Sequence, residues 1–282
     1  MNLENIIKKA SKKLKDNNIP SYILDAEVIL ADIMKIKRES LITNNITNIS
    51  NKIIKKYNKA IKRRVKKEPV AYITGKKEFW SKNFTVNKST LVPRPETELL
   101  LYKIINIYKN KKINILDVGT GSGCILISLL KELKNSRGTG IDISSKAIKI
   151  AKINSKNHEI SNRVKFKNFD IGSFSYGCYD LIISNPPYIA SLDIKKLGNE
   201  IINFEPREAL DGGSDGLDLI KKVIYKSNTL LKRKGILALE IGYGQYRKVS
   251  RILKYYKFRE HSKIFDYNRN VRCIIGTKID FI

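Results

Sequence analysis

Stretches typical of buried β-strands alternate with stretches typical of amphipathic helices from residue 111 onward. This alternation constrains the fold most, because successive strand–helix–strand segments form parallel β-α-β units. The expected strands cover 113–118, 139–143, 164–167, 180–184 and 236–241, and the expected helices cover 122–133, 145–154, 217–231 and 246–255. The sequence therefore predicts an α/β fold with a doubly wound, mostly parallel sheet.

Both ends of the chain depart from this alternation. Two further strands are expected near 259–265 and 272–277 with no helix between them, which predicts an antiparallel pair at the sheet edge. At the other end, apolar residues recur at helical spacing and predict a small all-helical domain. We therefore expect a helical domain over 1–68, a β-hairpin connector over 69–93 and an α/β domain over 94–282.

A glycine-rich turn, Asp-Val-Gly-Thr-Gly-Ser-Gly at 117–123, joins the first strand to its helix. In a doubly wound sheet this turn lies at the carboxyl ends of the strands, where ligands bind. Asp142 ends the next strand 19 residues after Gly123, the spacing of an acid that binds a ribose hydroxyl. We expect an adenosine-containing ligand held by Gly119, Thr120, Gly121, Ser122, Gly123 and Asp142.

The same turn narrows the identity of the ligand. Its G-x-G-x-G pattern differs from the dinucleotide-binding pattern G-x-G-x-x-G. It also lacks the lysine of the Walker A phosphate-binding loop. Asp117, directly before the turn, favours a cationic ligand. S-adenosylmethionine carries a sulfonium and an ammonium group and is the expected cofactor. Asp170 after the third strand could accept a hydrogen bond from adenine, with Ile171 over the ring, although Asp170 could equally be a turn residue.

Asn-Pro-Pro-Tyr at 185–188 follows the fourth strand of the pattern. Prolines lack a backbone N–H and keep the preceding residue extended. The Asn185 side-chain oxygen, the Pro186 carbonyl and the Tyr188 ring can therefore surround a planar group that carries an NH2. An exocyclic amine of a nucleobase and a carboxamide both fit, and in isolation the segment would also suit a tight turn.

Five segments of the chain resemble the family of peptide-chain release factor glutamine-N5 methyltransferases. They cover 68–75, 92–98, 117–123, 185–188 and 205–213. The resemblance implies a Rossmann-like class I methyltransferase domain that methylates the glutamine of the Gly-Gly-Gln motif in class-I release factors during translation termination. It implies cofactor contacts from Gly119 to Gly123, Asp142 and Asn185, and substrate contacts from Asn185, Pro186, Pro187 and Tyr188. Some relatives carry an aromatic residue where this chain has Ile171.

Two other functions fit parts of the sequence. The alternative enzyme is an N-methyltransferase that acts on an exocyclic amino group in DNA or rRNA, and the net charge of +28 favours it. Lysine is abundant throughout the chain, however, so the charge could be compositional. A non-enzymatic cofactor-binding module is the third possibility. Residues 52–67 hold nine Lys or Arg and no acid, so this segment could dock a release factor or RNA.

The remaining expectations concern location and auxiliary groups. The three cysteines, Cys124, Cys178 and Cys273, are far apart, so we expect neither a metal site nor disulfides. The first 18 residues suit an amphipathic helix better than a signal peptide, and no apolar run has membrane-spanning length. We expect a cytoplasmic monomer. Arg94, Glu96 and Glu98 precede or begin a helix, where they could line a cleft or favour the helix amino terminus.

Overall fold

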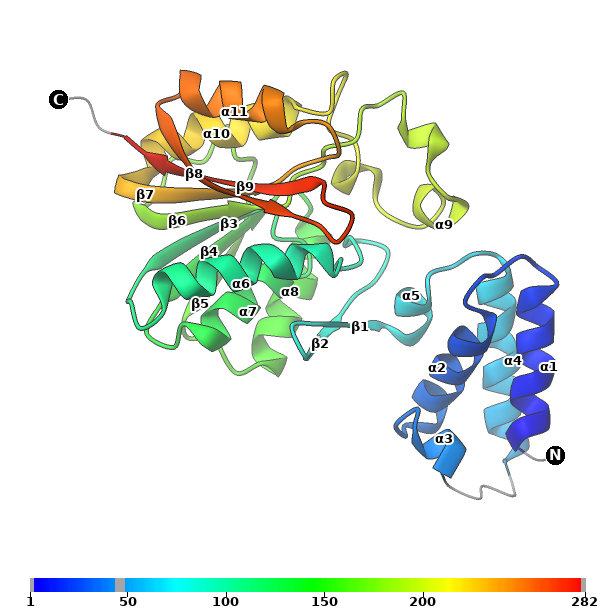
Figure 1. The fold of residues 1–282 in the computed structure, drawn as a ribbon. Helices are drawn as coiled ribbons and strands as arrows, with labels where there is room; N and C mark the ends of the chain where they lie inside the picture. The colour runs from blue at the N-terminus through cyan, green and yellow to red at the C-terminus, as the bar shows by residue number, and fades with distance from the viewer. Residues whose placement is uncertain (1–2, 44–48, 280–282) are drawn as a thin grey trace. The chain divides into compact units, whose positions relative to one another are not determined.

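The computed structural model describes residues 3–43 and 49–279. The chain divides into two compact units (Figure 1). The first comprises Met1–Lys76 with Gly198–Phe204, and the second comprises Lys77–Leu197 with Glu205–Ile282. The chain therefore passes between the units three times, because a short segment from the middle of the sequence belongs with the amino-terminal unit.

The first unit is helical, as the apolar spacing predicts. It contains α1 (Leu3–Lys15), α2 (Tyr22–Met34), α3 (Ser40–Thr43), α4 (Asn51–Val65), α5 (Val70–Thr74) and α9 (Asn199–Ile202). Leu14, Ile29 and Tyr57 are fully buried in its core. Ser50 caps α4 by accepting a hydrogen bond from the Ile53 N–H, which confirms it as an N-cap. α5 was not predicted, because its five residues are too few for a periodic pattern.

A buried arginine joins the inserted segment to the first unit. The Arg64 side chain, only 4% exposed, donates to the Asp25 carboxylate at 2.6 Å and to the Glu200 carboxylate at 2.8 Å. Glu200 lies on α9. Removing one partner of a buried charge leaves an uncompensated ion, so both acids stabilise this arginine in the core. Helical spacing predicts the α4 face but not an acid that lies 136 residues away in the sequence.

The second unit contains a seven-stranded sheet of order β5-β4-β3-β6-β7-β9-β8. Its strands are β3 (Asn114–Val118), β4 (Arg137–Asp142), β5 (Val164–Asn168), β6 (Tyr179–Ser184), β7 (Leu231–Glu240), β8 (Phe258–Phe265) and β9 (Val271–Lys278). The first five strands are parallel, and β9 runs antiparallel to both β7 and β8. The doubly wound sheet and its antiparallel edge pair are therefore confirmed.

Helices cover both faces of this sheet (Figure 1). One face carries α6 (Glu96–Tyr108), α7 (Cys124–Glu132) and α8 (Ser145–Asn157), and the other carries α10 (Asp218–Leu230) and α11 (Tyr246–Tyr255). Two short 3-10 turns, Ile194–Lys196 and Arg207–Ala209, lie between β6 and α10.

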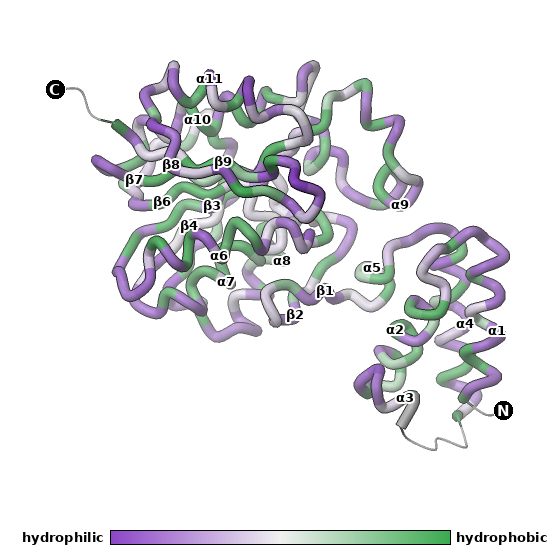
Figure 2. Tube along the Cα trace, in the orientation of Figure 1, coloured by the Kyte–Doolittle hydropathy of each residue, from purple (hydrophilic) through white to green (hydrophobic). Residues whose placement is uncertain are grey.

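The central strands are apolar on both faces because each face has its own helical layer. Ile115, Leu181 and Ile183 pack into the core beneath α6, α7 and α8. Their chain neighbours Leu116 and Ile182 point to the opposite face, into the core beneath α10 and α11. Figure 2 shows these strands as mostly hydrophobic, while the turns at the rim of the sheet are mostly hydrophilic.

The predicted hairpin forms from β1 (Lys76–Phe79) and β2 (Lys82–Thr85). We predicted it as a connector, but Phe79 and Phe84 are buried in the core beneath α6, α7 and α8. Asn154 on α8 accepts a hydrogen bond from the Thr85 N–H at 2.7 Å and donates to the Thr85 and Ser122 carbonyls. The hairpin is therefore built into the second unit, and one buried asparagine ties it to the glycine turn.

Candidate active site

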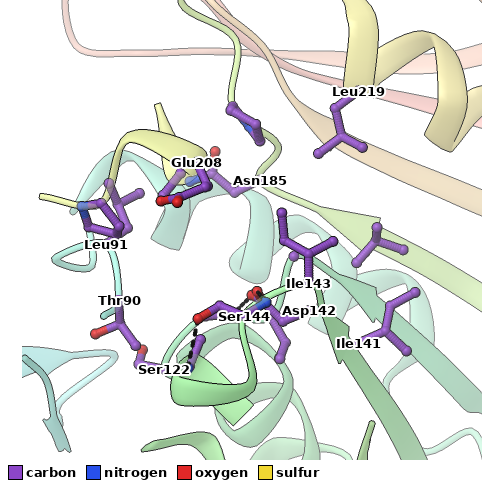
Figure 3. Close-up of a pocket in the computed structure, with 18 of the residues that line it drawn as sticks. Thr90, Leu91, Ser122, Ile141, Asp142, Ile143, Ser144, Asn185, Glu208 and Leu219 are labelled. Carbon is purple, nitrogen blue, oxygen red and sulfur yellow. Dashed lines mark hydrogen bonds between the residues drawn. The ribbon is translucent and has the colours of Figure 1, made fainter. Parts of the chain in front are cut away.

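A cavity of about 980 Å³ opens at the carboxyl ends of β3, β4 and β6 in the second unit. Its walls include the glycine turn, residues 141–147, residues 169–171, and Asn185 with Pro187. Residues 88–91, 93–94, 206, 208–209 and 211–213 and the first turns of α10 line its other side. In Figure 3, Leu91, Asn185 and Glu208 lie at one end, while Ser122, Asp142 and Ser144 lie at the other.

The strand register explains why the two main motifs meet. β3 and β6 are neighbours, and Val118 at the end of β3 lies opposite Ser184 at the end of β6. The Ser184 hydroxyl donates to the Val118 carbonyl at 2.7 Å. β4 and β5 continue the sheet on one side of this pair and β7 on the other, so the pair is the topological switch point where ligands bind. Gly119 and Asn185 therefore leave the sheet next to each other.

Two glycines present bare backbone to the cavity. Gly119 and Gly121 have φ angles of +71° and +54°, in the left-handed region that favours glycine. A Cβ at Gly119 would meet nothing within 4 Å, so nothing in the protein fills the space beside it. Gly123 differs, because its Cβ would lie 3.0 Å from Ile127 and 3.2 Å from Phe166, and Gly123 does not line the cavity. Gly123 thus permits close helix packing.

Asp142 lines the cavity and connects two turns around it. One carboxylate oxygen accepts from the Gly121 N–H at 2.9 Å, and the other accepts from the Ser144 N–H at 2.8 Å. Burial raises the pKa of Asp142, and these two backbone hydrogen bonds oppose the shift. Each oxygen keeps a second lone pair, so Asp142 can still accept from a hydroxyl of a ligand. Ser144 also caps α8, as predicted.

Asp117 does not meet the cavity. Its carboxylate is 0% exposed and lies behind the turn, where the Thr120 hydroxyl donates to it at 2.6 Å. Burial raises the pKa of Asp117 to about 7, the Thr120 hydrogen bond opposes the shift, and the nearby charge of Asp142 adds to it. We predicted that Asp117 favours a cationic ligand, but its carboxylate is buried and does not line the cavity. Strand alternation explains this, because successive side chains point to opposite sides.

Asp170 and Ile171 both line the cavity, and each also has contacts within the protein. One Asp170 oxygen accepts from the Gly172 N–H, the geometry of a turn-forming aspartate, and this was the alternative role considered for it. Ile171 is 3% exposed and packs into the core beneath α10 and α11. Phe169 is half-buried beside them and contributes an apolar wall.

Asn185 is half-buried and lines the cavity. Its amide nitrogen donates to the Thr97 hydroxyl at 3.3 Å. Among the residues that the structure describes, no donor reaches the amide oxygen of Asn185. Pro187 also lines the cavity, whereas Pro186 is buried and does not. The side-chain oxygen of Asn185 is therefore available to accept a hydrogen bond from a ligand.

Tyr188 has a different environment from the predicted one. We expected its ring to cover a bound amide, but Tyr188 does not line the cavity. The Arg272 guanidinium lies over the ring, 5.1 Å from its centroid, and donates to the Tyr188 hydroxyl at 2.7 Å. That hydroxyl donates in turn to the buried Glu240 carboxylate at 3.2 Å. Burial raises the pKa of Tyr188 to about 12, so the hydroxyl remains a donor.

The arginine and acids before α6 have separate roles. Arg94 lines the cavity and donates to the buried Glu205 carboxylate at 2.7 Å, which joins two of the family-like segments. Glu98 instead accepts from the Trp80 N–H at 2.8 Å and holds the hairpin. Neither Glu96 nor Glu98 is among the described residues that line the cavity. Only Arg94 of the three therefore belongs to the cleft.

Sequence reasoning missed several lining residues. Ile143, Glu208 and Leu219 line the cavity from three different segments (Figure 3). Ile143 directly follows Asp142, so its position could have been inferred from the strand end. Glu208 and Leu219 carry no spacing signal. Over residues 3–43 and 49–279, no cluster of three potential metal ligands occurs, and no helix is long and apolar enough to span a membrane.

Comparisons with known proteins agree with this architecture. Residues 5–75 match the PrmC N-terminal domain family, and residues 109–260 match a methyltransferase domain family. The chain is 38% identical over 281 residues to the release factor glutamine methyltransferase of Fusobacterium nucleatum subsp. nucleatum, covering 97% of this chain and 78% of that relative. It is 39% identical over 278 residues to the protein of that name from Buchnera aphidicola subsp. Schizaphis graminum, covering 99% and 100%.

A crystal structure of a methyltransferase from Pyrococcus furiosus superposes with a TM-score of 0.53 at 17% identity, covering 70% of this chain and 89% of that one. At this identity the likeness concerns the fold alone. Sheet order, glycine turn and cavity together define a class I methyltransferase domain with a helical amino-terminal unit. The two curated relatives identify the group within that class. The chain belongs to the release factor glutamine methyltransferases, which confirms the resemblance of its five segments.

Proposed function

We propose that this protein transfers a methyl group from S-adenosylmethionine to the side-chain amide nitrogen, N5, of the glutamine in the Gly-Gly-Gln motif of class-I release factors. One observation carries the proposal: the glycine turn and the unpaired amide oxygen of Asn185 open on the same cavity. The register of Val118 opposite Ser184 supports this, because it sets the two motifs side by side. Family membership supports the choice of substrate.

The residues of the cavity fit S-adenosylmethionine. The open space beside Gly119 leaves room for a ligand against the backbone of the turn. Asp142 would accept from the ribose hydroxyls, and Phe169, Ile171 and Ile143 would supply apolar contacts to the adenine. Gly123 would act through packing. When bound, this cofactor supplies an electrophilic methyl group on a sulfonium sulfur.

The protein must then orient a weak nucleophile, the glutamine amide nitrogen, toward the methyl group. An amide nitrogen is poorly nucleophilic because its lone pair is delocalised into the carbonyl. Hydrogen-bond acceptors that hold both N–H groups stabilise the positive charge that develops on that nitrogen. The rest of the rate enhancement comes from holding the nitrogen close to the methyl group and in line with it. Asn185 would accept one N–H through its side-chain oxygen. The Pro186 carbonyl as acceptor of the second N–H stays a prediction. A new N–C bond forms, the S–C bond breaks, and the nitrogen releases one proton to water.

Mass spectrometry tests the proposed reaction. The purified protein is incubated with S-adenosylmethionine and an intact class-I release factor, and the Gly-Gly-Gln peptide is then analysed. We expect a single added methyl group on the glutamine and none when that glutamine is replaced by glutamate. Parallel reactions with DNA and rRNA examine the alternative substrate class. Methylated nucleobase with unmodified glutamine would overturn the proposal.

We further propose that the helical amino-terminal unit docks the release factor, as predicted for residues 1–68, and that the enzyme works as a cytoplasmic monomer. The exposed side of α4 supports docking. Lys52, Lys55, Lys56, Lys59 and Lys62 are all exposed along it. Clustered positive charge accelerates the encounter with an acidic surface and orients it.

A charge-reversal experiment tests docking. Combining Lys52→Glu, Lys56→Glu and Lys59→Glu should raise KM for the intact release factor about tenfold, with little change in kcat, because rim charges act mainly on association. The matched control combines Arg247→Glu, Lys248→Glu and Arg251→Glu on the exposed side of α11, which changes net charge equally. Steady-state kinetics at fixed ionic strength measures both. Equal KM values for the two triple variants would contradict docking through α4.

A further inference from the structure

A chain of hydrogen bonds extends from Asn185 through Thr97 and Glu240 to Arg272 on β9. The Asn185 amide nitrogen donates to Thr97, and the Thr97 hydroxyl donates to the Glu240 carboxylate at 2.6 Å. Thr97 is 2% exposed and Glu240 is 0% exposed. The other Glu240 oxygen accepts from Tyr188 at 3.2 Å and from Arg272 at 3.3 Å. Four segments of the chain thus contribute to one polar network, which borders the cavity at Thr97 and Asn185.

The direction of each hydrogen bond follows from the chemistry. An ionised carboxylate only accepts, so the Thr97 hydroxyl must donate its one proton to Glu240. Its oxygen can then only accept from the next neighbour, which must be the NH2 end of the Asn185 amide. The amide oxygen of Asn185 therefore points away from Thr97. An asparagine side chain has two nearly isosteric ends, and this network distinguishes them.

We propose that Thr97 and Glu240, with Arg272, are positioning residues that hold the Asn185 amide with its oxygen turned toward the substrate. The inference rests on the proposed function, because it concerns the acceptor for the glutamine N–H. An Asn185 amide in the opposite orientation would present NH2 to the NH2 of the substrate, and the two donors would repel. Burial raises the pKa of Glu240, and the hydrogen bond from Thr97, the Arg272 guanidinium at 3.3 Å and the hydrogen bond from Tyr188 oppose that rise. Arg272 therefore contributes by balancing the buried charge of Glu240 and favouring the ionised, accepting carboxylate.

A matched pair of substitutions at Thr97 tests the inference. Thr97→Val keeps the shape of the side chain but removes the hydroxyl, whereas Thr97→Ser keeps the hydroxyl. For Thr97→Val we expect kcat to fall about 10- to 100-fold, the range of a misplaced hydrogen-bonding group. The dissociation constant for S-adenosylmethionine should stay within about twofold, because the Thr97 hydroxyl bonds to Glu240 and Asn185 and not to the glycine turn. Thr97→Ser should keep kcat within about threefold of the wild type.

Glu240→Gln provides a second variant that keeps size and hydrogen bonding. A glutamine with its oxygen toward Arg272 offers NH2 to Thr97, which reverses the Thr97 hydroxyl and favours the flipped Asn185. We expect kcat to fall about tenfold or more, with S-adenosylmethionine binding retained. Thermal unfolding of all variants, with kinetics measured well below each midpoint, separates a folding defect from a positioning defect.

The outcomes separate this inference from the proposed function. If the wild type yields no methylated glutamine, both fail. If the wild type is active and Thr97→Val matches it in kcat, the positioning role alone is overturned. Equal loss of kcat in folded Thr97→Ser and Thr97→Val would also overturn it, because the hydroxyl would then be irrelevant. Loss confined to Thr97→Val and Glu240→Gln supports the inference.

Discussion

Replacing Asn185 with alanine should lower kcat for glutamine methylation by on the order of 100- to 1,000-fold, the effect of removing one preorganised acceptor or donor from an enclosed site. The Asn185 oxygen has no donor among the described residues and faces the cavity, so its loss removes an acceptor for the substrate amide. Affinity for S-adenosylmethionine should change by no more than several-fold, because the glycine turn and Asp142 remain. Single-turnover kinetics and cofactor titration measure the two effects separately.

Two further substitutions sharpen the Asn185 experiment. Asn185→Asp keeps an acceptor but cannot donate to Thr97, whose hydroxyl is committed to Glu240. The new carboxylate would lie near the negative charge of Glu240, so we expect the Asn185→Asp variant to lose most of its activity as well. Asn157→Ala, at the exposed end of α8, is the control for an Asn→Ala change. Wild-type kcat in Asn185→Ala would remove the proposed mechanism.

The stability of the second unit should depend on pH through Asp117. Burial raises the pKa of this carboxyl group from 3.8 to about 7. Between those values the folded protein holds a proton that the unfolded chain has released. The contribution of Asp117 to the free energy of unfolding is therefore fully present below the unfolded pKa, and it is lost as pH rises through about 7. From about pH 5 to pH 8 this group should lower the free energy of unfolding by about 3 kcal/mol.

Asp117→Asn isolates this contribution, because it removes the titration while keeping the shape of the side chain. The difference in unfolding free energy between variant and wild type should shift by about 3 kcal/mol in favour of the variant over that range, a large share of a typical 5–15 kcal/mol. Urea unfolding followed by the fluorescence of Trp80, the single tryptophan, reports on the second unit. Asp16→Asn, on an exposed residue, is the control. A constant difference from pH 5 to pH 8 would contradict the assignment.

Local sequence patterns predicted the elements and the turns between them well. The glycine turn and Asn-Pro-Pro-Tyr could be placed at one cavity because parallel strands share a carboxyl edge. Ser50 and Ser144 were predicted as helix caps because capping depends on residues three positions away. These features all arise within one or two elements, where spacing carries the information.

Contacts between distant segments could not be predicted from spacing. Thr97 lies 88 residues from Asn185 and 143 residues from Glu240, so no period links them. Tyr188 was assigned to the substrate because its ring follows two prolines, but the buried Glu240 and Arg272 engage it instead. Asn154 similarly joins the hairpin to the glycine turn with no local signature. The sequence signal for such a contact was a charged residue at the end of an apolar strand, here Glu240, because a buried charge needs partners from other segments.

The inserted segment around Glu200 has a consequence for biosynthesis. Translation delivers α4, with Arg64, long before the ribosome has produced Glu200, which lies 136 residues downstream. During synthesis the helical bundle therefore has only Asp25 to neutralise Arg64, and it acquires its second counter-charge after four of the seven strands of the large sheet have been made. Expression of the bundle as an isolated fragment would make that provisional state permanent.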